Sequence, residues 1–231
     1  MWPCTITKLI NLRFLQSPPL FISLRQPPSA SQDRLPTTNN FVANFVLGQI
    51  DFTTTTAGST LSKFDMPQQV STHSGKFIVT DYNNSRVLAW NTIPNGNASA
   101  DIIVGANPVN RACSATTLYD PESAMVASGK LVIADNTNNR VLLYNPIPTS
   151  NNASPDTIPG QASLTQCTAN NDDQDTFPDA GPTARTLYNP TAAWTDGTRL
   201  VVSDATNYRV LIWNSFPTTG FQATDLASGQ T

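Results

Sequence analysis

The sequence predicts an all-β protein built from one unit of four short antiparallel strands that occurs three times. One pattern of about 28 residues returns twice at fixed spacing, which is far outside what low complexity produces. Charged residues make up only 13% of the chain, while Asn, Thr, Ser and Pro are abundant. That composition suits short strands joined by turns and fits poorly with helices.

Eight positions of the pattern are identical in all three copies, and they set its frame. In chain order they are Pro67, Pro121 and Pro190; Asp81, Asp135 and Asp204; Asn84, Asn138 and Asn207; Arg86, Arg140 and Arg209; Val87, Val141 and Val210; Leu88, Leu142 and Leu211; Asn91, Asn145 and Asn214; and Pro94, Pro148 and Pro217.

Each copy reads as four strands in order. The first strand follows the leading proline, which is tolerated at a strand start, over residues 68–72, 122–127 and 191–195. After a glycine turn, the second strand is expected over 76–80, 131–134 and 200–203. The third runs over 86–90, 140–144 and 209–213. The fourth is the short run that ends at Gly105, Gly160 and Gly229.

The apolar residues of these strands come in nearly continuous runs, which indicates sheets covered on both faces. Four short strands in each repeat indicate a β-propeller in which each repeat forms one blade. The linkers between blades vary in length, as linkers should when the blade itself is rigid. The longest runs from Gly160 to Pro190 and contains the acidic run from Asn171 to Asp175.

The order of proline, first strand, glycine turn, Asp, Asn, Arg-Val and aromatic-Asn resembles the NHL repeat, whose propellers are commonly six-bladed. The resemblance covers Phe41 to Thr231. It implies an incomplete NHL-like β-propeller of four-stranded antiparallel blades, with three blades at about 64–105, 118–160 and 187–229 after an orphan outer strand at 41–49. Three blades cannot close a ring, so we expect a fragment of a longer propeller or self-association of copies that completes one.

Residues 1–40 do not match the repeat, and we interpret them as a disordered leader or a degenerate targeting segment. Prolines and polar residues interrupt every candidate signal core, and no stretch has the length of a membrane span. These residues carry a net charge of +3, which leaves −6 for the remainder of a chain whose total is −3. A nucleic-acid partner is disfavoured because such partners are bound through clustered Lys and Arg.

The Asp and Arg of each repeat invite a catalytic interpretation, but their threefold copying favours a structural one. A catalytic set is normally single, whereas Asp and Asn hold tight turns and Arg pairs with Asp across a hairpin. We therefore assign no catalytic residue and expect structural pairs at Asp81 and Arg86, at Asp135 and Arg140, and at Asp204 and Arg209.

The residues that usually hold metals are sparse. The single histidine, His73, is expected in a solvated turn, which argues against zinc chemistry and a Ser-His-Asp triad. No metal site or cofactor is assigned; Asp173 and Asp175 leave open a casual calcium site without a full set of ligands. Cys113 and Cys167 are expected to be free thiols, because equivalent points on neighbouring repeats are usually too far apart to bond. The compartment stays open, with an extracellular or periplasmic location ahead of a cytoplasmic one.

The turn between the second and third strands opens on the same side as the linkers, where binding loops usually lie. The predicted binding residues are Asn83, Asn84, Asn138, Asn139, Asn207 and Tyr208. Their polar, nearly uncharged surface favours a protein or glycan partner. The expected function is a non-enzymatic binding or scaffold module. The alternative is a fragment of a propeller enzyme, of the metal-dependent lyase or lactonase type, whose ligands lie in blades missing here.

Overall fold

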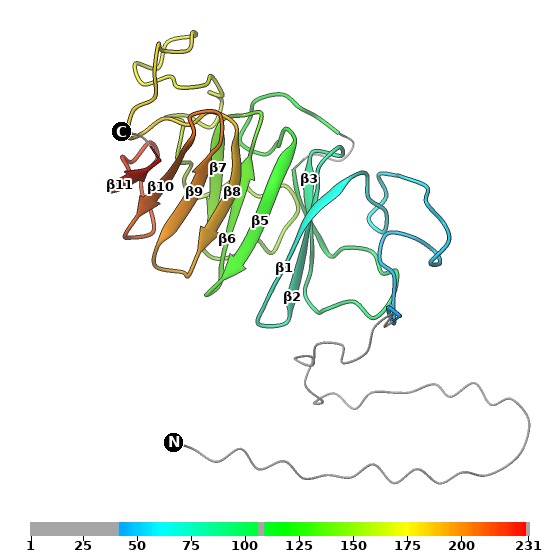
Figure 1. The fold of residues 1–231 in the computed structure, drawn as a ribbon. Coiled ribbons are helices and arrows are strands. Elements are labelled where there is room, and N and C mark those ends of the chain that lie inside the picture. The colour runs from blue at the N-terminus through cyan, green and yellow to red at the C-terminus, as the bar shows by residue number, and fades with distance from the viewer. Residues whose placement is uncertain (1–41, 106–108, 230–231) are drawn as a thin grey trace, which may run out of the picture. The chain divides into compact units, whose positions relative to one another are not determined.

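A computed structural model describes residues 42–105 and 109–229, and within them eleven strands form three antiparallel sheets (Figure 1). The first sheet contains β1 (Pro67–His73), β2 (Lys76–Asp81), β3 (Arg86–Trp90) and β4 (Ile102–Gly105). The second contains β5 (Pro121–Ala127), β6 (Lys130–Asp135) and β7 (Arg140–Tyr144). The third contains β8 (Pro190–Thr195), β9 (Leu200–Asp204), β10 (Arg209–Trp213) and β11 (Leu226–Ser228). No helix occurs among the described residues, so the all-β prediction is confirmed.

The three sheets repeat one register. In each, the leading proline pairs with the Asp that ends the second strand, as Pro121 does with Asp135. A bulge follows that proline in β1, β5 and β8. The glycines that close the fourth strands also share one backbone conformation, with φ of 99° at Gly105 and Gly160 and 105° at Gly229. The repeat that the sequence shows is therefore a repeat in three dimensions.

Two predicted outer strands differ from the expected regular strands. Residues 42–49, the described part of the predicted orphan strand, form no strand, and Leu47 packs against the first sheet. In the second sheet, the fourth segment still pairs with β7, because Leu143 N donates to Thr157 O and Val141 N to Pro159 O, both at 3.0 Å, but the ladder is shorter than in the other sheets. Pro159 stands in that segment, and a proline has no N–H to donate to a ladder.

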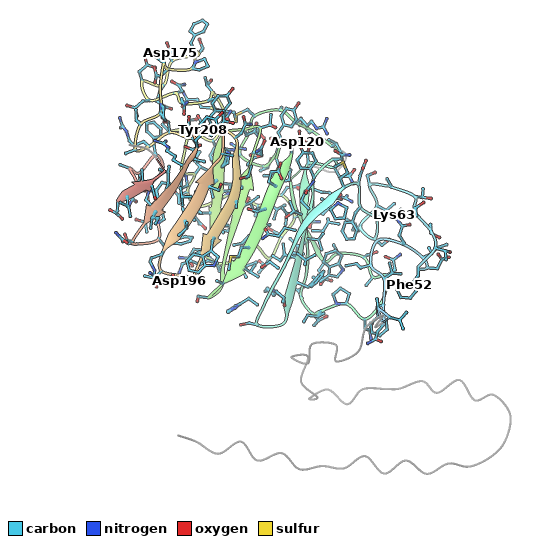
Figure 2. The ribbon with its side chains drawn as sticks, viewed as in Figure 1. Phe52, Lys63, Asp120, Asp175, Asp196 and Tyr208 are labelled. Carbon is cyan, nitrogen blue, oxygen red and sulfur yellow. A yellow bond between two sulfur atoms is a disulfide. The ribbon has the colours of Figure 1, made fainter. Side chains whose placement is uncertain are left out.

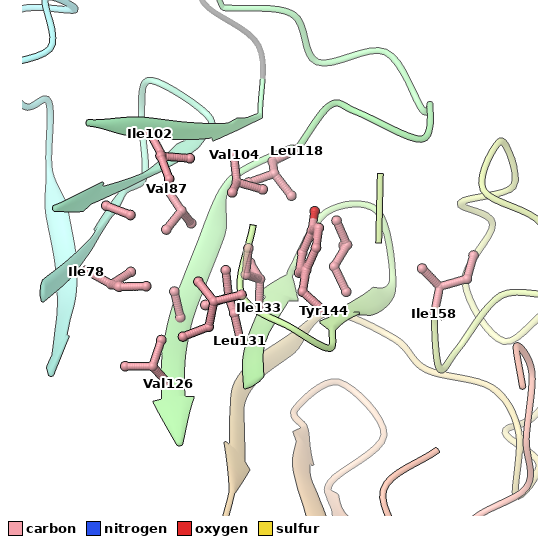
Figure 3. Packing of buried hydrophobic residues seen from close by; sticks show 14 residues of the cluster. Ile78, Val87, Ile102, Val104, Leu118, Val126, Leu131, Ile133, Tyr144 and Ile158 are labelled. Carbon is pink, nitrogen blue, oxygen red and sulfur yellow. The ribbon is translucent and has the colours of Figure 1, made fainter. Parts of the chain in front are cut away.

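The core consists of layers between consecutive sheets. Figure 3 shows the first layer, where Ile78, Val87 and Ile102 of the first sheet meet Leu131, Ile133 and Tyr144 of the second. The second layer joins the second sheet to the third, and Trp213 is its largest buried side chain. The second sheet, which has a neighbouring sheet on both sides, is thus buried on both faces, as the continuous apolar runs predict.

Candidate functional site

The turns between the second and third strands meet the linkers at one end of the sheets. Three equivalent hydrogen bonds join them: Asn83 N donates to Asp65 O, Thr137 N to Tyr119 O, and Thr206 N to Tyr188 O. We call this end the linker face. In Figure 2, Tyr208, Asp120 and Asp175 lie toward it, and Asp196 lies at the opposite end. The predicted placement of turns and linkers on one side is therefore correct.

The identical Asp, Asn and Arg of each repeat form a buried network behind this face. In the second sheet, Asp135 Oδ1 accepts the backbone N–H of Tyr119 at 2.7 Å. Its Oδ2 accepts Asn138 Nδ2 at 2.9 Å and Arg140 Nε at 2.8 Å. Burial raises the pKa of Asp135 above its ordinary value, and the Arg140 charge opposes that shift. Since neither side chain is exposed, this ion pair has no access to a substrate.

The same ion pair occurs in the other two sheets, at 2.8 Å in both, so the predicted structural pairing is confirmed. Each arginine also fastens the linker that leads into its own sheet. Its Nη2 donates to two linker carbonyls that lie 26 and 23 residues earlier in the chain. The acceptors are Thr60 and Lys63 for Arg86, Ser114 and Thr117 for Arg140, and Thr183 and Thr186 for Arg209.

Most of the predicted binding asparagines are buried by these contacts, which corrects the expectation of an amide-rich surface. Asn84, Asn138 and Asn207 each donate to the Asp of their own turn. Asn139 donates to Cys167 O and accepts the N–H of Asn189. All four are at most 7% exposed, because an amide that holds a turn must face inward.

The two other predicted binding residues stay accessible on the linker face. Asn83 is partly exposed, with its amide donating to Asp65, and Tyr208 is 84% exposed. Tyr188, 39% exposed, precedes the third sheet on the same face. The surface that the structure presents is therefore aromatic rather than amide-rich.

A non-repeated group of charged side chains lies between the first and second sheets. Asp120 and Glu122 flank Pro121, where the first copy has Met66 and Gln68 and the third has Asn189 and Thr191. Glu122 falls in the bulge of β5, between the paired residues Pro121 and Ser123. Bulges often re-aim a side chain beside a functional site.

Arg111 from the linker completes this group, which we call the acidic-aromatic cluster: Tyr82, Arg111, Tyr119, Asp120 and Glu122. The Arg111 guanidinium lies 3.5 Å from Asp120 Oδ1 and 5.2 Å from the centre of the Tyr119 ring. It also donates to Ser85 Oγ at 3.1 Å and Asn83 O at 3.0 Å. One arginine thus ties the linker to the turn of the preceding sheet.

The cluster shifts the titration of its own members. Partial burial raises the pKa of Glu122, and the charge of Asp120 raises it further. Burial likewise raises the pKa of Tyr82, and both carboxylates add to the effect. Two carboxylates against one arginine leave the cluster with a negative charge when both are ionised.

Sequence reasoning missed this cluster, although a signal for it exists. The leading proline is constant, and only in the second copy are both residues beside it charged, as Asp120 and Glu122. A second missed set is repeated: Asp101, Asp156 and Asp225 accept the backbone N–H of Asn91, Asn145 and Asn214. Each of these aspartates stands four residues before its terminal glycine, a spacing that the sequence displays.

Cys113 and Cys167 form a disulfide with Cα atoms 6.1 Å apart, so the prediction of free thiols is wrong. The two cysteines stand at similar places, eight residues after Gly105 and seven after Gly160. Cys113 adjoins Ser114, whose carbonyl accepts a hydrogen bond from Arg140. The carbonyl of Cys167 accepts a hydrogen bond from Asn139. Both linkers are thus drawn to the turn of the second sheet. Structural disulfides form and persist mainly in oxidising environments.

His73 and the acidic carboxylates of the long linker make hydrogen bonds to backbone groups. The predicted solvated histidine is instead partly buried at the end of β1, where Nε2 accepts Ser128 N at 3.2 Å. Asp173 and Asp175 accept backbone N–H groups of their own loop. In the described part of the chain, no three His, Cys, Asp or Glu side chains gather around a point where an ion would fit.

Comparison with known proteins assigns no class. No protein-family model matches the sequence, and no curated protein matches it. The described residues contain no helix long and apolar enough to cross a membrane.

Proposed function

We propose that this chain forms three consecutive blades of an NHL-like β-propeller and acts as a non-enzymatic binding module through its linker face. The propeller rests on three features of the described sheets: a common register, a common bulge after the leading proline, and sheet-to-sheet layers made by equivalent positions. A rigid scaffold of this kind presents its variable turns and linkers for recognition.

The observation that favours binding is the contrast between repeated and non-repeated charges. The repeated Asp and Arg residues are buried and engaged with backbone groups, so they stabilise each blade. The acidic-aromatic cluster occurs once, is partly exposed and lies on the linker face. Its carboxylates and tyrosines suit a partner that combines a cationic head with an apolar stem, as lysine and arginine side chains do.

The wider linker face supports the same partner. The long linker adds Asp172, Asp173 and Asp175, of which Asp172 is paired with Arg185. Tyr208 and Phe177 are 84% and 70% exposed. Exposed tyrosines on rigid loops supply contact area at low conformational cost. We therefore assign a protein partner with a basic segment.

Binding to a panel of short peptides tests this assignment. The panel contains lysine- and arginine-bearing peptides, the same peptides with glutamine in their place, and neutral oligosaccharides. We expect the basic peptides to bind and Glu122→Gln to weaken them about tenfold, or ~1.4 kcal/mol. Affinity should fall on acidification at a higher pH than an ordinary glutamate would give, because the pKa of Glu122 is raised and binding needs its charge.

Asp196→Asn is the matched control, since Asp196 lies at the opposite end of the sheets. It should leave peptide affinity unchanged. Equal affinities of wild type and Glu122→Gln would contradict the proposal, as would binding of the oligosaccharides alone.

A further inference from the structure

The forward face of a sheet, defined as the face toward the next sheet in the chain, is buried in the first two sheets. On the first sheet it includes Ile78, Val87 and Ala89, which are 0%, 0% and 7% exposed. On the second sheet the equivalent residues are Val132, Val141 and Leu143, all 0% exposed. What buries them in each case is the sheet that follows.

The forward face of the third sheet is apolar and open. Val210, equivalent to Val87 and Val141, is 38% exposed, and Leu226 in β11 is 54% exposed. Val201 and Ile212 are partly exposed. Trp194 stands opposite Val201 in the ladder and is 43% exposed. A tryptophan among branched aliphatic residues is typical of the centre of a protein interface.

The other end of the row of sheets also exposes apolar groups. Val70 of β1 is 64% exposed, whereas its equivalents Ala124 and Ala193 are 1% and 4% exposed against the preceding sheet. Phe45 and Phe52, in the segment before β1, are 59% and 63% exposed. The outer half of that face is covered by Leu47, Leu61 and Phe64, which leaves its inner strand open. This strand and segment form the β1 end.

The contact between two consecutive sheets becomes less polar along the chain. Between the first two sheets, β5 donates backbone N–H groups of Ala124 and Val126 to Gln69 and Ser71 of β1. Between the second and third, β8 donates from Ala193 to Ser123, while the position of Ser71 is taken by Met125. On the third sheet the same two positions are Ala192 and Trp194. Its forward face therefore suits an apolar contact.

We propose that the forward face of the third sheet docks on the β1 end of a second copy of this chain, head to tail. The contact repeats, between two molecules, the one that the chain makes twice within itself. Trp194 and Val210 would cover the inner strand around Val70. Each copy carries both surfaces, so the interface is heterologous and can join further copies.

Light scattering after size exclusion, over a range of protein concentrations, tests this arrangement. We expect wild type to assemble as concentration rises. Val210→Asp and Val70→Asp should each weaken assembly at least tenfold, because each places a charge in one half of the contact. Tyr208→Asp is the matched control, since its side chain is 84% exposed but lies on the linker face.

Mixing the two defective variants distinguishes a head-to-tail contact from a face-to-face one. Val210→Asp keeps an intact β1 end and Val70→Asp keeps an intact forward face, so together they should form a complex that neither forms alone. A wild type that stays monomeric, or a Val70→Asp variant that assembles normally, overturns the proposal. Hydrogen exchange on wild type gives a readout without substitution: β1, β8 and β10 should gain protection as concentration rises.

Discussion

Replacing Arg140 by methionine should destabilise the protein far more than replacing an arginine in a surface ion pair. Arg140 is completely buried with Asp135, and its guanidinium also donates to the carbonyls of Ser114, Thr117 and Leu164. Methionine fills part of the space but donates nothing. The change therefore leaves a buried carboxylate and three linker carbonyls without their partner.

Breaking a buried pair by removing one partner costs about 4 kcal/mol. For a domain of this size, 1 kcal/mol lowers the melting temperature by roughly 2–4 °C, so we expect a decrease on the order of 10 °C. Thermal unfolding followed by far-ultraviolet circular dichroism, with urea unfolding as a second measurement, gives the value.

Arg199→Met is the control, because the Arg199 and Asp196 side chains are 57% and 30% exposed. Exposed pairs contribute at most about 1 kcal/mol, so this variant should melt within a few degrees of wild type. A decrease for Arg140→Met no larger than that of Arg199→Met would refute the structural role given to the repeated ion pairs. A double variant with Asp135→Leu should lose less stability than the two single changes added together, because the unpaired charge is then absent.

Three further predictions concern the linkers and turns. Reduction of the disulfide between Cys113 and Cys167, which are 54 residues apart, should lower stability by about 4 kcal/mol, measured by urea unfolding with and without reductant. Gly105→Ala should destabilise more than Gly75→Ala: both have positive φ, but a Cβ at Gly105 meets a backbone oxygen at 2.7 Å and one at Gly75 meets nothing within 4 Å. The Asp196 carboxyl, whose pKa backbone N–H donors lower to about 2, should titrate near that pH by NMR, and its contribution to stability, present above about pH 4, should be lost as the pH falls toward 2. Equal stability with and without reductant, equal effects of the two glycine substitutions, or an Asp196 midpoint near 4 would each contradict its prediction.

The strands and ion pairs could be predicted because the residues that form them recur at the same spacing in all three copies of the repeat. The spacing from Pro121 to Asp135 fixes one edge of a hairpin, and two further copies separate constant positions from variable ones. Repetition, however, also hides the direction of a side chain. Asn139 and Tyr208 occupy the same position in equivalent turns, yet Asn139 is buried and donates to Cys167 O, whereas Tyr208 faces solvent.

What could not be predicted depends on contacts between repeats. The pairing of Cys113 with Cys167 follows from two linkers that both bond to the turn of the second sheet, and no spacing within a repeat reveals that approach. The acidic-aromatic cluster likewise combines a linker, a turn and a bulge from two sheets. Propensity and periodicity describe single strands, so they give no information on side chains that meet across sheets.

The arginine contacts to the linkers also indicate where this chain tolerates insertion. The first acceptor carbonyl always lies 26 residues before the arginine in the sequence, although the linkers themselves differ in length. Everything between the terminal glycine of one sheet and the first of those carbonyls is therefore outside the repeated frame. Between Gly160 and Thr183 such a stretch already accommodates extra residues, and a foreign recognition sequence grafted into its exposed part at Thr176 to Pro178 would leave the third sheet anchored as before.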